Sequence, residues 1–198
     1  MIQLCNRTVS TIHYLWRVAS YIPITVRKLL LQSLVFPVFD YASCVYCDLP
    51  DYLNQKLKRM QNSCLRFVTK IRRDEHVTPY YIEHNLLKIK DRRLVSIATL
   101  LYRVLNSNSR AYLKEKFVMR TAVSHRTNRY TNCSLEMPSH RTDIYSKSFV
   151  CTAIRLYNNH HLDRFIHYKT PVKLKRYLTE LSLSEYGHHV SNLFIVYL

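Results

Sequence analysis

Glycine is almost absent from this chain, since Gly187 is the only one among 198 residues. At the average usage of about 7%, a chain of this length would hold roughly fourteen. Glycine-rich phosphate loops, dinucleotide-binding turns and Asn-Gly hairpins need glycine where φ is positive or the backbone approaches a ligand closely. The scarcity excludes these classes and favours helices joined by polar turns.

Acidic residues are also scarce, with 13 Asp and Glu against 30 Lys and Arg and a formal net charge of +17. Because 47% of the residues are hydrophobic, the chain can bury a core and does not belong to the disordered class. This charge favours an anionic partner, first nucleic acid and second an acidic membrane surface. No apolar run reaches the roughly 20 residues of a spanning helix, so we expect no membrane segment.

The cysteines do not form a recognisable framework. Six of them lie at irregular positions from Cys5 to Cys151, and no signal peptide precedes them, which predicts free thiols in a reducing compartment. We therefore expect an intracellular protein, in the nucleus or the cytoplasm. Cys44 and Cys47 have the spacing of half a zinc site, but no second close pair follows, so the sequence predicts no metal.

Catalytic patterns are lacking as well. Phosphoryl transfer with two metal ions needs at least two positioned carboxylates. The carboxylates here have simpler explanations: Asp51 as a helix cap, Asp74 and Glu75 as charge balance, and Asp40 as a cap or a local ion pair. The sequence predicts no catalytic residue and no cofactor, and the chain is not expected to be an enzyme by itself.

The most informative segment runs from Lys56 to Arg73, KLKRMQNSCLRFVTKIRR. Apolar side chains recur in it at helical spacing and predict one buried face: Leu57, Met60, Cys64, Val68 and Ile71. Cations repeat with the same period on the opposite side: Arg59, Arg66, Lys70 and Arg73. This row is either the solvated side of a surface helix or a surface that contacts phosphates.

A second basic group supports the phosphate interpretation. Arg92 and Arg93 lie in the first turn of a helix that we expect to begin at Asp91. Cations at a helix N-terminus interact unfavourably with the helix dipole, which destabilises the helix by a few tenths of a kcal/mol. Helix stability does not explain this placement, which favours an outside ligand. Arg72 lies beside the first cationic row and is grouped with it.

Helical spacing predicts an all-α fold, a helical bundle with a long basic arm and a smaller C-terminal helical appendage. Pro37 should kink or split the second helix near Phe36. We expect a helical bundle over residues 1–117, a basic polar arm or linker over 118–147 and a C-terminal helical segment over 148–198. The arm carries three further arginines as candidate contacts: Arg126, Arg129 and Arg141.

An ordered series of segments resembles the C-terminal part of reverse transcriptases of non-LTR (LINE-type) retrotransposons of the jockey-like group. The segments are LLLQSLVFPVFDYASCVY (29–46), LKRMQNSCLRFV (57–68), HVTP (76–79), LLKIKDRR (86–93), HRTNRY (125–130), LEMPSHRT (135–142) and KSFVCTAIRLYN (147–158). The resemblance implies the helical thumb and the connection beyond it, which grip template and primer. It also implies that the catalytic carboxylates of an RNA-directed DNA polymerase would lie before Met1.

Two hypotheses follow from the sequence. The first is a nucleic-acid-binding fragment of a retroelement reverse transcriptase, without the catalytic palm, that contacts RNA, DNA or an RNA–DNA hybrid through phosphates. The second is a structural or protein-interaction helical module, a degenerate remnant whose basic face only keeps it in solution. The sequence leaves the oligomeric state open.

Overall fold

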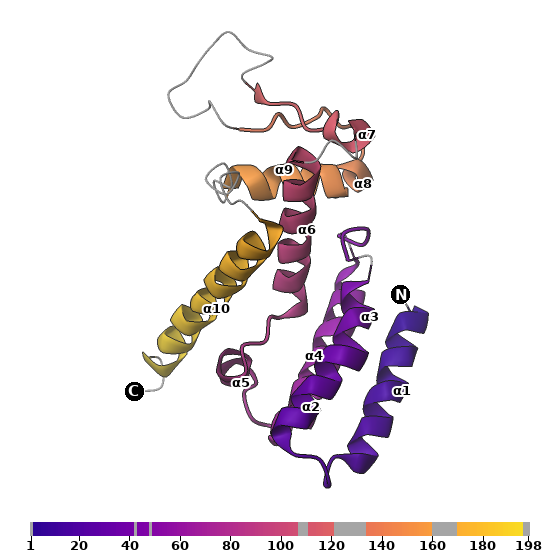
Figure 1. Cartoon of the computed structure of the whole chain (residues 1–198), viewed down its shortest axis with the longest axis vertical. Coiled ribbons are helices and arrows are strands. Elements are labelled where there is room, and N and C mark those ends of the chain that lie inside the picture. The colour runs from indigo at the N-terminus through magenta and orange to yellow at the C-terminus, as the bar shows by residue number, and fades with distance from the viewer. Residues whose placement is uncertain are drawn as a thin grey trace. The chain divides into compact units, whose positions relative to one another are not determined.

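The structure is a computed structural model that describes residues 2–41, 43–47, 49–106, 111–120, 134–159 and 170–195. In these ranges the regular structure is helical (Figure 1), and the one extended pairing is an isolated antiparallel bridge between Met119 and Leu135. The prediction of an all-α fold is confirmed.

The contacts of the chain define two compact units. Unit 1 comprises Met1–Tyr41, Leu49–Arg92 and Thr179–Leu198, and unit 2 comprises Ala42–Asp48 and Arg93–Leu178. Each unit therefore draws on segments that lie far apart in the sequence. The predicted segments 1–117, 118–147 and 148–198 instead follow the chain in order.

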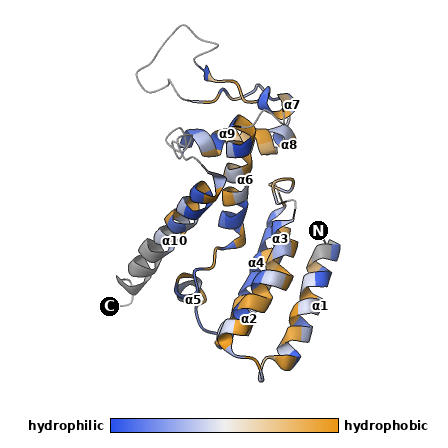
Figure 2. Cartoon of the chain, in the orientation of Figure 1, coloured by the Kyte–Doolittle hydropathy of each residue, from blue (hydrophilic) through white to orange (hydrophobic). Residues whose placement is uncertain are grey.

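Unit 1 is built mainly from the helices of the first half of the chain. They are α1 (Ile2–Val18), α2 (Ile24–Leu30), the π-helical η1 (Leu31–Val35), α3 (Phe36–Asp40), α4 (Asp51–Thr69) and α5 (Thr78–Glu83). α4 packs against α1, α2 and α5, and α1 carries both hydrophobic and hydrophilic residues along its length (Figures 1 and 2). Leu57, Phe67 and Val68 of α4 are buried, and the rings of Phe67 and of Trp16 on α1 form a T-shaped pair with a centroid distance of 5.8 Å. An amphipathic α4 thus forms the centre of this unit.

Pro37 interrupts the second helix as predicted. α2 continues into the π-turn η1, where the N–H of Phe36 donates to the carbonyl of Leu31, and α3 begins at Phe36. Proline has no N–H, and its ring clashes with the carbonyl four residues before it in a regular helix. The wider π-turn accommodates the proline while Leu31 and Val35 stay buried.

Two buried polar side chains tie α4 to its surroundings. Gln61 is 2% exposed; its Nε2 donates to the carbonyl of Leu87 at 2.7 Å, and its Oε1 accepts from the N–H of Ile89 at 2.8 Å. Arg27 of α2 is also buried, and its Nη1 donates to the carbonyl of Val68 at 3.4 Å. Gln61 thereby fixes the segment that leads into α6 (Ile89–Asn106), and Arg27 satisfies a carbonyl at the end of α4.

The second half of α10 (Pro171–Ile195) also belongs to unit 1. The hydroxyl of Tyr186 donates to the carboxylate of Asp91 and accepts from the N–H of Lys88 at 3.1 Å, and Lys88 Nζ lies 4.3 Å from the ring centroid. Burial, followed by the hydrogen bond to Asp91, raises the pKa of Tyr186 well above its usual range. The phenol therefore stays protonated and holds α10 to the start of α6.

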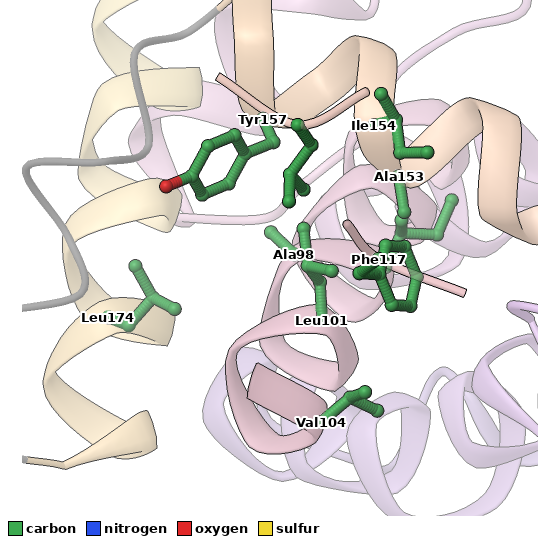
Figure 3. Packing of buried hydrophobic residues seen from close by; sticks show 10 residues of the cluster. Ala98, Leu101, Val104, Phe117, Ala153, Ile154, Tyr157 and Leu174 are labelled. Atoms are coloured by element: carbon green, nitrogen blue, oxygen red, sulfur yellow. The ribbon is translucent and has the colours of Figure 1, made fainter. Parts of the chain in front are cut away.

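Unit 2 has its own hydrophobic core around α6. Besides α6 it contains α7 (Ala111–Lys114), α8 (Asp143–Ser146), α9 (Phe149–Asn159) and the first turns of α10. Its buried cluster consists of Ile97, Ala98, Leu101, Val104, Phe117, Leu135, Ala153, Ile154, Tyr157 and Leu174. Side chains of α6 and α9 and the ring of Phe117 meet in this core (Figure 3).

Part of the predicted arm belongs to this core. Leu135 is 1% exposed, its N–H donates to Asn158 Oδ1 at 3.0 Å, and Asn158 Nδ2 donates to its carbonyl at 3.0 Å. The N–H of Arg120 donates to the backbone carbonyl of Ser134 at 2.9 Å, and the N–H of Glu136 donates to the backbone carbonyl of Val118 at 2.8 Å. Residues 118–120 and 134–137 of the predicted polar arm over 118–147 thus pack against the core of unit 2, because the buried Leu135 anchors them.

Candidate nucleic-acid interface

The helix with the first cationic row ends earlier than its periodicity predicts. α4 stops at Thr69, and Lys70 takes a left-handed conformation with φ 59°, from which its N–H donates to the carbonyl of Arg66 at 2.8 Å. Left-handed residues commonly close helices and are usually glycine, which this chain lacks here. The prediction that Lys70 and Arg73 continue the helical row is therefore wrong.

Arg66 folds the chain after this cap back onto the helix. Its Nε donates to the carbonyl of Arg72 at 3.3 Å, and its Nη2 donates to the carbonyl of Arg73 at 3.0 Å. The guanidinium of Arg66 is therefore committed to these carbonyls and does not point freely from the solvent side. These hydrogen bonds hold Arg72 and Arg73 near the end of α4, next to Lys70, and all three side chains are exposed. We call Arg66, Lys70, Arg72 and Arg73 the α4 terminal cluster.

The acidic residues that follow take part in the same turn. Glu75 Oε1 accepts from the N–H of Arg72 at 3.4 Å, and Oε2 accepts from the hydroxyl of Tyr80 at 3.1 Å. That hydrogen bond is the main reason why the pKa of Tyr80 is raised. Tyr81 is buried and donates to Asn62 Oδ1 at 3.0 Å. Glu75 thus shapes the turn, and Tyr81 packs within the fold.

Helix electrostatics explain only part of this cluster. A helix C-terminus carries about half a negative elementary charge, which favours a nearby cation. The α4 terminal cluster places four cations there, and counting Asp74 and Glu75 against them still leaves two positive charges. The cations therefore exceed what the dipole requires.

Arg59 remains on the solvent side of α4, as the sequence predicts. It is exposed, and it lies seven residues before Arg66, so the two side chains share one side of the helix. Lys56, one turn earlier, is exposed as well and was not among the predicted contacts. These cations connect the middle of α4 with its terminal cluster.

Arg92 lies in unit 1 but is already paired. Its Nε donates to Asp40 Oδ1 at 2.9 Å, its Nη2 contacts Asp40 Oδ2, and its guanidinium lies over the ring of Phe36 at 4.3 Å from the centroid. Asp40 therefore forms an ion pair, but with a residue 52 positions away in the sequence and not with a local partner as predicted. The carboxylate offsets the charge that Arg92 was expected to offer to phosphates.

Substituting Asp40 should leave the charge of Arg92 without its carboxylate partner and available to phosphates. We expect Asp40→Asn to raise the affinity for nucleic acid several-fold at low salt, because one more uncompensated cation can displace counterions. The cost in stability should stay below about 1 kcal/mol, since the pair is partly exposed. Fluorescence anisotropy with a labelled oligonucleotide measures the affinity. Asp143→Asn, which breaks the Lys147 pair in unit 2, is the matched control; equal gains in both variants would contradict a specific role of Arg92.

Arg93 is not available to a ligand in this structure. It is 8% exposed, belongs to unit 2, and lies with its guanidinium 5.4 Å from the ring centroid of Tyr46. Burial lowers its pKa, although an arginine remains charged at neutral pH. The two neighbours that the sequence grouped as one cationic pair therefore have different environments.

The structure describes one of the three candidate arginines in the arm. Arg141 is exposed in unit 2, whereas Arg126 and Arg129 lie outside the described residues.

Unit 2 holds 16 of the 30 Lys and Arg but only five of the 13 Asp and Glu. Its exposed cations outside the predicted set include Arg103, Lys116, Arg120, Arg155 and Lys173. They follow no common helical period, so sequence spacing gave no signal for them.

The described cysteines show no metal site. Cys5, Cys44, Cys47, Cys64 and Cys151 are free thiols. Burial raises the pKa of Cys64 far above the usual range and also raises that of Cys44, which keeps both as unreactive thiols at neutral pH. Across the described ranges, no three or more His, Cys, Asp or Glu side chains gather closely enough to hold a metal ion.

Comparisons with family models, with curated proteins and with solved structures find no match for this chain. In the described part of the chain, no helix combines the length and the hydrophobicity needed to cross a bilayer.

Proposed function

We propose that this chain is a nucleic-acid-binding helical module, the thumb-like C-terminal part of a non-LTR retrotransposon reverse transcriptase, which grips template and primer. The α4 terminal cluster is the observation that carries the proposal. Arg66 uses its own side chain to fold Arg72 and Arg73 back to the helix end, next to Lys70. This arrangement concentrates exposed positive charge on one packed element, where phosphates can bind without any reading of sequence.

The ordered sequence segments support the assignment to reverse transcriptases, and the basic composition supports an RNA, DNA or hybrid partner. The proposed contacts are Arg59 and three members of the cluster, Lys70, Arg72 and Arg73. Arg141, Arg126 and Arg129 are secondary contacts from the region of the predicted arm. The chain is assigned no catalytic step of its own, and it would act inside the cell, in the nucleus or the cytoplasm.

A titration of the purified chain tests this function. Anisotropy of a labelled hybrid duplex should show saturable binding that weakens as salt rises, with a slope of log K against log salt of about −0.9 for each phosphate neutralised. Saturable binding with a slope of several units supports the function. Absence of binding at 50 mM salt overturns it.

A second candidate, a protein-interaction module, is favoured by one observation. Large apolar side chains are exposed on the first elements of unit 1, among them Tyr14, Tyr21, Leu29 and Leu34 at 68, 88, 63 and 48%. Surfaces of this kind often contact other proteins. This candidate predicts weak, non-saturable nucleic-acid binding together with self-association that Leu29→Glu and Leu34→Glu abolish, as measured by light scattering.

A further inference from the structure

One side of α4 combines an exposed aromatic ring with cations. Tyr52, Lys56, Arg59, Ser63 and Arg66 recur at i, i+4, i+7, i+11 and i+14, so they lie within one narrow arc of the helix. The ring of Tyr52 is 66% exposed, and Lys56 and Arg59 are exposed too. We call these five residues the α4 strip.

Packing in unit 1 does not account for the ring of Tyr52. The buried side of α4 carries Leu53, Leu57, Met60, Cys64 and Val68, which pack towards the neighbouring helices. Tyr52 lies outside that face, in the first turn, where its ring is open to solvent. The flat apolar ring of Tyr52 is therefore exposed next to two cations, and the packing of unit 1 does not explain its position.

We propose that the α4 strip binds single-stranded nucleic acid, with Tyr52 stacked on an unpaired base and Lys56 and Arg59 on the phosphates that follow. This inference rests on the proposed function and names the form of the nucleic acid at that surface. Aromatic stacking suits any base because every base has a π-face, and a cationic groove or strip beside it tracks the backbone.

The dimensions of the strip agree with this arrangement. Seven residues of helix rise about 10.5 Å, which separates Tyr52 from Arg59 along the axis. A stacked strand advances about 3.4 Å per nucleotide, so this distance corresponds to about three nucleotides. Within a duplex the base faces are already stacked on their neighbours. The ring can thus engage a single strand or an overhang but not the interior of a double helix.

The experiment compares two ligands and matched variants. A labelled single strand containing 2-aminopurine and a blunt duplex of the same sequence are titrated with the whole chain. We expect Tyr52→Ala to bind the single strand roughly 5- to 100-fold more weakly and the duplex with little change, because one stacking contact is lost. A ring stacked on 2-aminopurine should quench its fluorescence. Because Tyr52→Phe keeps the ring, its affinity and its quenching should match those of the wild type. Tyr41→Ala, an exposed tyrosine outside α4, should bind like the wild type.

Salt dependence separates the ring from the cations. Tyr52→Ala removes no charge and should leave the slope of log K against log salt unchanged, whereas Arg59→Ala should reduce it by about 0.7 on a single strand. If Tyr52→Ala binds both ligands like the wild type, or weakens both equally, the stacking contact is wrong while the proposed function stands. If the wild type binds neither ligand, both fail.

Discussion

The triple substitution of Arg59, Arg72 and Arg73 by alanine is expected to weaken nucleic-acid binding about 10- to 100-fold at low salt and to reduce the salt slope by about 2 to 3. The reason is that each of these exposed guanidiniums would displace counterions from one phosphate. Their aliphatic stems are not part of the core, so the fold should persist. Anisotropy titrations between 50 and 200 mM salt measure both quantities.

A control variant removes the same charge elsewhere. Arg103, Arg120 and Arg155 are exposed arginines of unit 2 that do not belong to the predicted contacts. Replacing these three by alanine lowers the net charge equally, so any effect of overall charge on the encounter with nucleic acid is the same. A loss of slope confined to the first variant supports the α4 surface. Equal losses would mean that binding follows total charge and not this surface.

Gln61→Ala is expected to have the largest effect on stability, lowering the free energy of unfolding by about 2 to 5 kcal/mol. The side chain satisfies the carbonyl of Leu87 and the N–H of Ile89 inside unit 1, and it is itself buried. Alanine can bond to neither group, so two backbone groups would stay buried without their partner. Trp16 is the only tryptophan, and it contacts Phe67 in the same unit, so its fluorescence during urea unfolding reports the change.

Gln55→Ala on the same helix is the matched control. Gln55 is exposed, and removing an exposed side chain from a helix should change stability by no more than about 0.5 kcal/mol. Similar urea midpoints for Gln61→Ala and the wild type would show that the two hydrogen bonds do not hold the segment before α6.

The helices could be predicted from the sequence because their signals are local. The apolar period places Leu57, Met60, Cys64 and Val68 on one buried face of α4, as observed, and Pro37 breaks the second helix. The end of α4 could not be predicted. It depends on a left-handed Lys70 where glycine is usual and on Arg66 bonding to carbonyls six and seven residues later. The cations after the cap therefore lie off the predicted row.

Pairing across long sequence distances also limits prediction of the site. Asp40 meets Arg92 although 52 positions separate them, and no period in the sequence links the two. Arg92 and Arg93 are neighbours in the chain, yet consecutive residues of a helix point in directions about 100° apart. One side chain consequently reaches a carboxylate while the other is buried beside Tyr46. Composition predicted the basic character of the chain, but only the fold distinguishes exposed cations from those that are buried or paired with a carboxylate.

Chemical footprinting of arginines on the unmodified chain tests the α4 interface most directly. Phenylglyoxal reacts with exposed guanidiniums, and peptide mass spectrometry gives the reaction rate at each arginine with and without a hybrid duplex. Arg59, Arg72 and Arg73 should be protected when the duplex is bound, while Arg103 and Arg155 keep their rates. Protection of Arg103 and Arg155 with unchanged rates at Arg59, Arg72 and Arg73 would contradict the interface proposed on α4.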